Sequence, residues 1–529
     1  MEIARLKKIS DYVFHHAELS PRAEALVWRD TRISYAQLAR AVEQVSLALI
    51  AHGIERGDRV ALLGTPRPEF FIVMMAAADI GAIWMGIHPR YTLHEMSHVI
   101  ETASPKLVFS YREIDGRDYR DDLAELAQRY PSIEQIIMLD EVDPDLGIGY
   151  ESFLCRGAES MDRLPAARAA VQSDDSAVII FTSGTTGRPK AAMNSHFGLV
   201  HCARVELGRW PAKDLRLLQN MPINHIANIG MMSSYALVAG GTLVFMDRFD
   251  PGEILRTIEN ERITFWLQAP AMFHLVINHA DFETTDLSSL QYIVWGGGPM
   301  PQHMVERLGK LGARLAMAYG MTELTAYASY SDADASVEVL ANTIGKPEPS
   351  YQLRLMKADW SRPAIGESGE IQAKGRWLMN GYFNDSQATA EAFSDDGWFK
   401  TGDVAELRED GNWTLVGRSK EMYKSGGFNI YPREIEMAIE EHPAVAMAAV
   451  LGTPDPVYDE VGYAFVQLQP DQKVDVDALN HWCRQRLANY KVPKTFEIVT
   501  ELPRLAIGKI DKQGLKRRLA ESSHDEASG

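Results

Sequence analysis

Short runs rich in β-branched and aliphatic residues alternate with longer segments of helical spacing over most of this chain. The run at 60–63, for example, is followed by a segment at 68–80 with helical periodicity. This alternation predicts α/β layers with buried sheets, and ligand-binding loops in such folds lie at the carboxyl ends of strands. The runs expected to form strands are 59–64, 106–110, 177–181, 242–246, 264–267, 292–295 and 314–317.

The pattern changes after residue 417, where shorter elements of both kinds follow one another. Helices are expected at 432–441 and 476–487, and strands at 445–451, 462–468 and 495–499. We therefore expect an α/β fold with two parts. A large N-terminal domain of layered α/β sheets spans 1–419, and a small C-terminal α+β domain spans 420–529. The polar residues 521–529 are expected to fray.

Two apolar stretches are long enough to raise the question of a membrane span. Residues 70–87 carry only Asp79 as a charge, and residues 226–246 carry none. Glycine interrupts both stretches, at Gly81 and at 240–241, and the composition changes from helix-like to strand-like there. Buried helix–turn–strand units are the expectation, with no integral membrane span.

Charge and cysteine content narrow the functional class. The 529 residues carry a formal net charge of −18, which argues against a nucleic-acid-binding protein because phosphate backbones require a basic face. The three cysteines, Cys155, Cys202 and Cys483, are far apart and form no CxxC pair. No apolar signal core follows the N-terminus, so we expect a protein of the reducing cytoplasm.

The segment 179–190 reads IIFTSGTTGRPK, an apolar run followed by small hydroxyl residues and glycines and closed by Lys190. Glycine lets a backbone approach polyphosphate, hydroxyl and amide groups donate to phosphate oxygens, and lysine adds a positive charge. The spacing differs from GxxxxGK[ST], so this is not the common P-loop. Taken alone, the loop could equally be a surface turn.

Four further segments carry chemically useful residues. Residues 319–323 (YGMTE) follow an expected strand and offer a ring for base stacking, a hydroxyl for phosphate and a carboxylate for Mg²⁺. Residues 398–403 (WFKTGD) end in an acidic residue of the kind that holds ribose hydroxyls. Residues 417–432 contain GRSKE and SGGFN, and residues 503–510 place Lys509 on a glycine-flanked loop. Each segment alone has an ordinary reading as a turn, linker or surface charge.

Taken in order, these motifs resemble the signature series of the adenylate-forming (ANL) superfamily, specifically its AMP-forming acyl-CoA synthetases. The resemblance covers nearly the whole chain, from 33–38 to Lys509. It implies an enzyme that uses ATP and Mg²⁺ to activate a small carboxylic acid as an acyl-adenylate. The acyl group then passes to coenzyme A, and AMP and pyrophosphate are released.

The resemblance also implies roles for individual residues. Lys509, Thr185, Glu323 and His225 are the candidate catalytic residues, and Glu323 is the metal ligand. The phosphates would contact Thr182, Ser183, Gly184, Thr185, Thr186, Gly187, Lys190 and Thr322. Adenine would lie against Gly296, Gly297, Gly298 and Tyr319, and ribose against Asp403 and Arg418.

The implied mechanism includes a rotation of the C-terminal domain about Lys420. Lys509 reaches the site in the first step, and Gly426 and Gly427 face a narrow thioester channel in the second. Arg90 would meet a phosphate of coenzyme A, with a surface or helix-cap role as the alternative.

Some alternatives stay open. An acyl-AMP ligase or a luciferase-like adenylating enzyme would share these motifs without using coenzyme A. The acyl pocket would draw on largely apolar residues, His225, Met231, Met232, Trp295 and Met321, but they do not identify the acid. Trp295 either narrows the pocket toward a flat or compact acid or packs in the sheet. A homodimer is one option for the oligomeric state.

Overall fold

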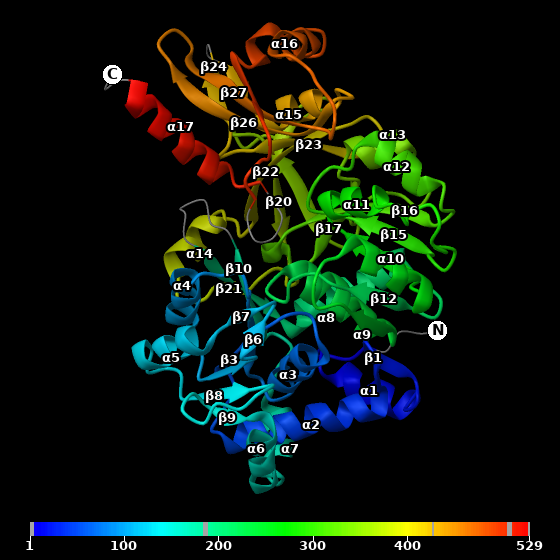
Figure 1. Cartoon of the computed structure of the whole chain (residues 1–529), viewed down its shortest axis with the longest axis vertical. Coiled ribbons are helices and arrows are strands. Elements are labelled where there is room, and N and C mark those ends of the chain that lie inside the picture. Colours follow the sequence, from blue (N-terminus) through cyan, green and yellow to red (C-terminus); the bar gives the residue numbers. More distant parts are fainter. Residues whose placement is uncertain (1–4, 183–188, 426–427, 505–509, 527–529) are drawn as a thin grey trace.

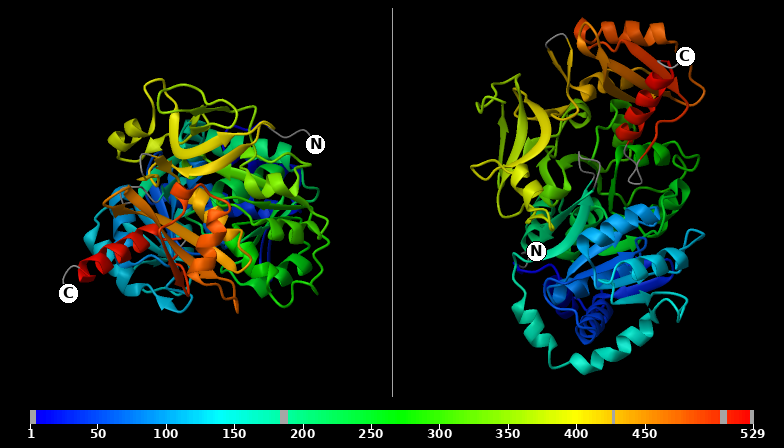
Figure 2. Two further views of the ribbon diagram at one scale, coloured as in Figure 1. Left: turned by 90° about the horizontal axis from the view of Figure 1, so that it is seen from above. Right: turned by 90° about the vertical axis from the view of Figure 1, so that its left-hand side faces the viewer.

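The computed structural model describes residues 5–182, 189–425, 428–504 and 510–526. A large body built from layered sheets and helices carries a smaller body at one end (Figure 1). Figure 2 shows the smaller body, in orange and red, seated against one end of the larger one. The expected α/β class is confirmed.

One sheet of the large body contains β10, the strand that leads into the predicted phosphate loop. Its strand β10 pairs in parallel with β4 and antiparallel with β11, and β11 pairs in turn with β21. The strand order is β21 (Gly381–Tyr382), β11 (Lys190–Ser195), β10 (Ser176–Thr182), β4 (Ile83–Ile87), β3 (Arg59–Leu63), β5 (Leu107–Ser110), β8 (Gln135–Met138) and β9 (Ile148–Gly149).

A second sheet carries the parallel strands β13, β12, β14, β15 and β16, so their carboxyl ends meet at one edge. Antiparallel β17 follows β16 through the turn that contains Glu323. The order is β18 (Lys346–Pro347), β17 (Tyr327–Tyr330), β16 (Arg314–Gly320), β15 (Tyr292–Trp295), β14 (Phe265–Gln268), β12 (Arg216–Gln219), β13 (Thr242–Phe245), β1 (Glu24–Trp28) and β2 (Thr31–Ser34).

Helices cover the faces of both sheets (Figure 1). Local signals start several of them: Ser34 forms a capping box with Gln37, and proline opens α3, α10 and α11. The helices are α1 (Asp11–Leu19), α2 (Tyr35–Ala51), α3 (Pro68–Asp79), α4 (Leu93–Ala103), α5 (Arg120–Arg129), α6 (Tyr150–Cys155), α7 (Leu164–Ala170), α8 (His196–Arg209), α9 (Tyr235–Ala239), α10 (Pro251–Asn260), α11 (Pro270–Ile277), α12 (Gln302–Gly309), α13 (Val337–Asn342) and α14 (Ser386–Ala392).

A smaller antiparallel sheet follows in the chain and ends at the start of the C-terminal part. Its last two strands place Asp403 directly opposite Arg418. The order is β19 (Gln352–Met356), β20 (Ser368–Lys374), β22 (Phe399–Leu407) and β23 (Trp413–Arg418).

The C-terminal residues pack around their own apolar centres, which include Ile435, Val450, Ala464 and Leu479. Within the described residues of this part, three α-helices flank one sheet. The elements are β24 (Tyr423–Ser425), β25 (Phe428–Ile430), α15 (Pro432–Glu440), β26 (Val445–Asp455), β27 (Asp459–Leu468), α16 (Val476–Arg484), β28 (Thr495–Val499) and α17 (Lys512–Glu526).

The strands and helices expected from the sequence form within a few residues of their expected bounds. The apolar stretch 70–87 is confirmed as a helix, a turn at Gly81 and strand β4. The stretch 226–246 differs in detail, because its helix is a π-helix over Ala227–Ser234 before α9 and β13. Among the described helices, none has the length and apolarity needed to cross a bilayer. The expected fraying is wrong for 521–526, which continue α17.

Candidate active site

Glu323 and Thr182 come together although 141 residues separate them in the chain. Thr182 ends β10, and its hydroxyl donates to Glu323 Oε1 over 3.3 Å. Tyr382 of β21 donates to the same oxygen over 2.9 Å. Glu323 is 5% exposed, so two donors hold a carboxylate that is nearly out of water. This arrangement unites the ends of both large sheets.

Buried hydrogen bonds fix the turn that carries Glu323. Asn194 of β11 donates from Nδ2 to the carbonyl of Thr322 (2.9 Å) and to the hydroxyl of Thr325 (3.0 Å). Thr325 has a φ of 63°, a left-handed conformation that a β-branched residue adopts only when its surroundings impose it. Its hydroxyl donates to the carbonyl of Trp377 over 2.7 Å. The turn is therefore held from two sides.

Lys190 lies at the start of β11, with its Nζ 5.0 Å from the centre of the Tyr382 ring. Burial, and then the neighbouring Glu323 carboxylate, raise the pKa of Tyr382 above its usual value. Tyr382 therefore remains a neutral donor at physiological pH. A cation, a neutral hydroxyl pair and a carboxylate thus lie within one small region.

A second polar cluster lies around Asp403. Tyr319 at the end of β16 donates its hydroxyl to Asp403 Oδ2 over 2.6 Å. Arg418 Nε lies 2.8 Å from Asp403 Oδ1, as the register of β22 and β23 requires. Burial, and next the Asp403 charge, raise the pKa of Tyr319 well above its usual value, while the Asp403 charge raises that of Arg418. Asp403 is 4% exposed, so both of its oxygens are held by defined partners.

The glycine triplet follows β15 at the same sheet edge as Tyr319. A Cβ on Gly296 would lie 2.8 Å from Tyr327 Cε1 and 2.9 Å from the carbonyl of Ala318. Gly297 has a φ of 78°, in the region that favours glycine. A larger side chain would therefore clash with β16 and β17 at Gly296 and would be strained at Gly297.

Glu323 and Thr182 offer oxygen atoms of the kind that Mg²⁺ binds. Within the described residues, no group of three or more histidine, cysteine or acidic side chains is placed to hold a metal ion. A single carboxylate beside the predicted phosphate loop suits an ion that takes most of its ligands from a nucleotide and water.

For the other predicted site residues, the observed positions do not by themselves indicate a role. His225 accepts a hydrogen bond at Nδ1 from the backbone of Ala227 over 3.1 Å, next to the π-helix. Arg90 is exposed, and its backbone amide donates to His88 Nδ1 over 2.9 Å. Lys420 is exposed just after β23. Ser183, Gly184, Thr185, Thr186, Gly187, Gly426, Gly427 and Lys509 lie outside the described residues.

Arg504 and Ile510, which flank Lys509 in the chain, form an antiparallel bridge. The pKa of His274 in α11 is lowered by burial, by His303 and by Arg504. Arg504 therefore lies close enough to the large body for its charge to act on α11.

Several contacts were not anticipated from the sequence. Tyr382 and Asn194 carry no motif that marks them. Gln268, at the end of β14, donates from Nε2 to Asn220 Oδ1 over 2.7 Å. Gln268 Oε1, Asn220 Nδ2 and Trp295 Nε1 are buried without a hydrogen-bond partner in the described part of the chain. Trp295 is 0% exposed, in register with Gln268. The sequence signal that could have marked Gln268 and Asn220 is their position, since each amide stands at or just after the end of a short apolar run that forms a buried strand.

Known proteins resemble the chain over nearly its full length. The family model for AMP-binding enzymes matches residues 13–383, and that for the AMP-binding enzyme C-terminal domain matches 434–509. A feruloyl-CoA synthase of Amycolatopsis is 34% identical, covering 97% of this chain and 99% of its own. An indoleacetate–CoA ligase of Aromatoleum aromaticum is 33% identical, covering 97% and 98%. ATP-bound MatB from Rhodopseudomonas palustris is 27% identical with a TM-score of 0.83, covering 97% and 98%.

Proposed function

The chain belongs to the AMP-binding enzyme family, and we infer from this membership that it is an AMP-forming acyl-CoA synthetase. It activates a carboxylic acid with ATP as an acyl-adenylate and transfers the acyl group to coenzyme A. The relatives named as CoA ligases favour coenzyme A as acceptor over the acyl-AMP ligase and luciferase-like alternatives.

One observation carries the assignment of the reaction centre. Thr182, Glu323 and Tyr382 form one cluster, and Tyr319, Asp403 and Arg418 form another. Tyr319 and Glu323 are separated by only three residues of chain, so the clusters are neighbours. We propose that ribose binds at Asp403 and the triphosphate at Thr182 and Lys190. Adenine would lie between the glycine triplet and Tyr319, and residues 183–187 would complete the phosphate site.

The first step requires no general base, because a carboxylic acid with a pKa near 4 is ionised at neutral pH. Its oxygen attacks the α-phosphorus, and pyrophosphate leaves. The barrier comes from repulsion between two anions and from charge on the departing group. Lys190 and Lys509 would place positive charge against the phosphates. A magnesium ion held by Glu323 and the triphosphate would supply further positive charge there.

The second step places a thiol at the same acyl carbon. The coenzyme A sulfur attacks, the bond from carbon to the adenylate oxygen breaks, and AMP leaves while the thiol proton passes to solvent. We propose that residues 420–529 rotate about Lys420 between the steps, which withdraws Lys509 and brings Gly426 and Gly427 to a thioester channel. Arg90 would meet a coenzyme A phosphate, and His225 would border the acyl pocket.

We further propose that the acid carries a ring with a polar substituent. Gln268, Asn220 and Trp295 lie at the edge where the parallel strands end, and their unpartnered groups offer one acceptor and two donors. Buried polar groups in proteins are nearly always paired, so a substrate group that both accepts and donates would complete them. Three of the relatives are named for ring-bearing acids, feruloyl, indoleacetate and a dioxo-octahydroindenyl propanoate, whereas another is named for medium-chain acyl groups.

The experiment is a panel of carboxylic acids assayed for pyrophosphate release, with and without coenzyme A. Aryl and polycyclic acids bearing a hydroxyl, carbonyl or ring N–H should exceed straight-chain acids. Gln268→Leu should reduce that preference, because it removes the acceptor while keeping the volume. If no acid releases pyrophosphate, the reaction is assigned wrongly. If straight-chain acids lead and Gln268→Leu changes nothing, only the substrate class is wrong.

The use of Mg²⁺, a cytoplasmic location and a homodimer stay predictions. Chelation with EDTA should abolish pyrophosphate release if the metal is required. Light scattering of the purified protein measures the oligomeric state.

A further inference from the structure

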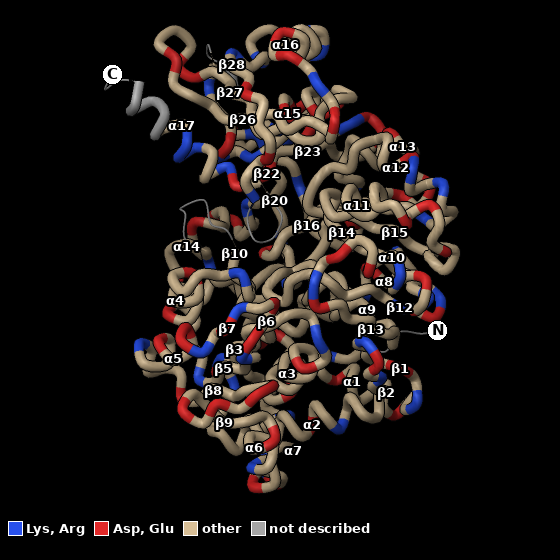
Figure 3. The backbone as a smooth tube through the Cα atoms, viewed as in Figure 1, with Lys and Arg blue, Asp and Glu red and all other residues tan. Residues whose placement is uncertain are grey.

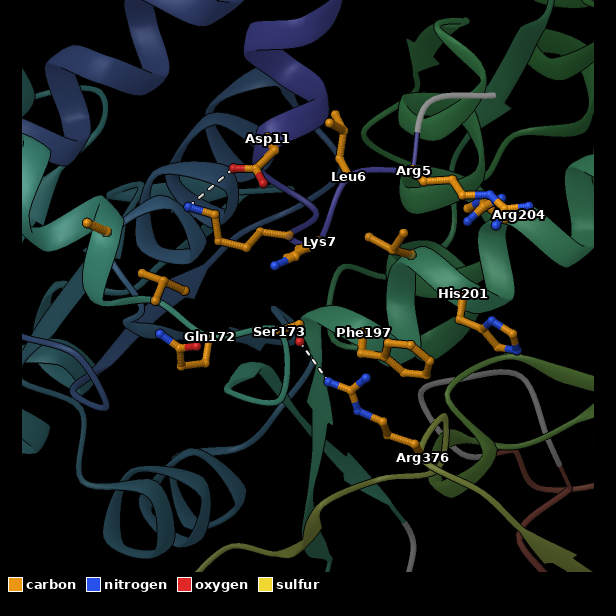
Figure 4. A pocket seen from close by; sticks show the side chains of 14 residues that line it. Arg5, Leu6, Lys7, Asp11, Gln172, Ser173, Phe197, His201, Arg204 and Arg376 are labelled. Carbon is orange, nitrogen blue, oxygen red and sulfur yellow. Dashed lines mark hydrogen bonds and ion pairs between the residues drawn. The ribbon is translucent and has the colours of Figure 1, made fainter. Parts of the chain in front are cut away.

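A surface cavity of about 720 Å³ lies outside the region of Glu323 and Asp403. It is bordered by the N-terminal segment before α1, the residues after α7, helix α8 and Arg376 (Figure 4). Five of its side chains are lysine or arginine, and only Asp11 is acidic. This charge balance contrasts with the net charge of −18 of the whole chain. The cationic residues are Arg5, Lys7, Lys8, Arg204 and Arg376.

Two of the five cations have protein partners. Lys8 lies 3.2 Å from Asp11 Oδ1, and Arg376 Nε lies 2.5 Å from Asp174 Oδ1. Arg376 also donates to Ser173 Oγ over 2.7 Å and lies over the Phe197 ring. These contacts hold the walls of the cavity in place.

For the other three cations, the described part of the chain provides no such partner. Within the described residues, Arg5, Lys7 and Arg204 have no carboxylate oxygen within 4.0 Å. The Nε of Arg204 is buried and has no hydrogen-bond partner in that part of the chain. In Figure 4, Arg5 and Arg204 extend to the same end of the cavity, beside His201. An unpaired buried donor and gathered like charges both cost free energy, and an anion between them would remove both costs.

The volume and the charge of the cavity limit the class of ligand that it can bind. Its volume lies in the range of sites for small molecules. Arginine forks match phosphate oxygens in paired hydrogen bonds, and three uncompensated cations exceed the charge of one phosphate group. The Phe197 and His201 rings, which line the cavity, stack with centroids 5.3 Å apart and planes 10° apart.

We propose that this cavity binds a small ligand with two or more phosphate groups, at a site separate from the one that binds the reacting nucleotide. Arg5, Lys7 and Arg204 supply its charge, and Arg376 and Ser173 form the opposite wall. The residue after Arg376 is Trp377, and its backbone carbonyl accepts a hydrogen bond from the hydroxyl of Thr325, in the turn that carries Glu323. The loop that borders the cavity at Arg376 therefore also contacts the turn that carries Glu323.

The test is calorimetric titration of the full-length protein with inorganic tripolyphosphate at low salt. Because the reaction centre also binds polyphosphate, the titrations use a Lys190→Ala background that weakens that site. One binding event should remain. Arg204→Gln, and separately Arg5→Gln with Lys7→Gln, should each weaken it about tenfold, since each removes charge-assisted hydrogen bonds. Arg40→Gln, an exposed arginine outside the cavity, should leave it unchanged.

Arg5 and Lys7 are exposed, so their double variant is expected to fold normally, and urea unfolding verifies this. Equal binding by that variant and by the Arg40→Gln control would overturn the proposal. Citrate binding as tightly as tripolyphosphate would overturn the assignment to phosphate. Neither result would bear on pyrophosphate release by the reaction centre.

Discussion

Glu323 depends on residues from two distant segments, one ending at Thr182 and the other at 379–382. Thr182 and Tyr382 hold one carboxylate oxygen, and Met379 donates its backbone amide to the Glu323 carbonyl over 2.9 Å. Because both donors bind Oε1, neither binds Oε2. A single oriented carboxylate of this kind is suited to holding one cation beside phosphate.

Tyr382→Phe tests whether this orientation matters for the reaction. The change removes one hydrogen bond to Glu323 and keeps the ring beside Lys190. A hydrogen bond contributes about 0.5–1.5 kcal/mol, and one to a charged group somewhat more, so kcat/KM for acid-dependent pyrophosphate exchange should fall about threefold to tenfold.

The matched control is Tyr351→Phe, which removes a hydroxyl that donates to Cys202 Sγ over 3.4 Å, outside both clusters. It should leave exchange unchanged. A Tyr382→Phe enzyme with full activity would show that Glu323 needs no help from β21.

The residues that the sequence predicts and those that it misses differ in how their contacts arise. Thr182, Glu323, Asp403 and Arg418 stand in recognisable motifs, so the resemblance predicts roles for them. Tyr382 reaches Glu323 only because β21 pairs with β11, and no local pattern encodes that pairing. Asn194 lies within a strand whose spacing indicates only burial.

Among the elements, the turn after β15 makes the most specific demand on side-chain size. A methyl group at Gly296 would meet Tyr327 and the Ala318 carbonyl at less than 3.0 Å, whereas at Gly298 its nearest neighbour is Pro270 Cγ at 3.9 Å. Gly296→Ala should therefore lower the free energy of unfolding by about 1–3 kcal/mol, and Gly298→Ala by under about 0.5 kcal/mol. Urea denaturation measures both; similar losses would mean that the β15 turn relaxes easily.

Helix α15 carries a buried acid whose charge stabilises the C-terminal part. Glu436 is 3% exposed, with Lys512 Nζ at 2.8 Å and Arg433 at 3.2 Å. Burial raises the pKa of Glu436, but Lys512, Arg433 and the amide of Val450 lower it further, so the net direction is downward. The ionised form is therefore favoured by folding.

A lowered pKa fixes the sign of the pH effect. The stabilisation from Glu436 is present above about pH 4.5, the value for an unfolded glutamate, and is lost as the pH falls through its lower folded value. Glu436→Gln should cost about 3 kcal/mol at pH 7, because it leaves buried cations uncompensated. It should also reduce the acid sensitivity of unfolding followed by circular dichroism.

Glu441→Gln is the control, since that side chain is 62% exposed and its pairing with Arg486 lies at the surface. It should change stability by less than about 0.5 kcal/mol. If both variants lost the same stability, or if Glu436→Gln kept the full acid sensitivity, burial of the pair would not explain the effect.

The sequence predicted whether a segment forms a helix or a strand more readily than it predicted the kind of helix. Purely apolar runs such as 177–181 and 292–295 predict buried strands, and both formed. The π-helix at Ala227–Ser234 could not be foreseen, because its apolar composition suits any buried helix. Its geometry follows from contacts such as that of Asn228 with Gln219, which join it to β12.

At the level of the whole molecule, two bodies meet beside the reaction centre. The chain passes from β23 to the C-terminal part just after Arg418, which holds Asp403. A Cβ on Gly417 would lie 3.1 Å from Tyr431 Cβ, so the first C-terminal residues pack on the last strand of the large body. The small body also approaches α11, because the charge of its Arg504 acts, after burial and His303, to lower the pKa of His274. A rotation at Lys420 would break the second contact while keeping the connection.

Lys509→Ala and Gly426→Leu together test whether the two steps use two arrangements of these bodies. In the proposed mechanism Lys509 adds charge to the first transition state only, so its loss should lower adenylate formation about 10²–10³-fold and spare thioester formation from presynthesised acyl-adenylate. A leucine at Gly426 would obstruct the proposed thioester channel, so it should spare pyrophosphate exchange and slow coenzyme A acylation. If Lys509→Ala impairs only adenylate formation and Gly426→Leu impairs only thioester formation, the small body must present a different face to the reaction centre in each step. Equal losses in both half-reactions for either variant would mean that one fixed arrangement performs the whole reaction.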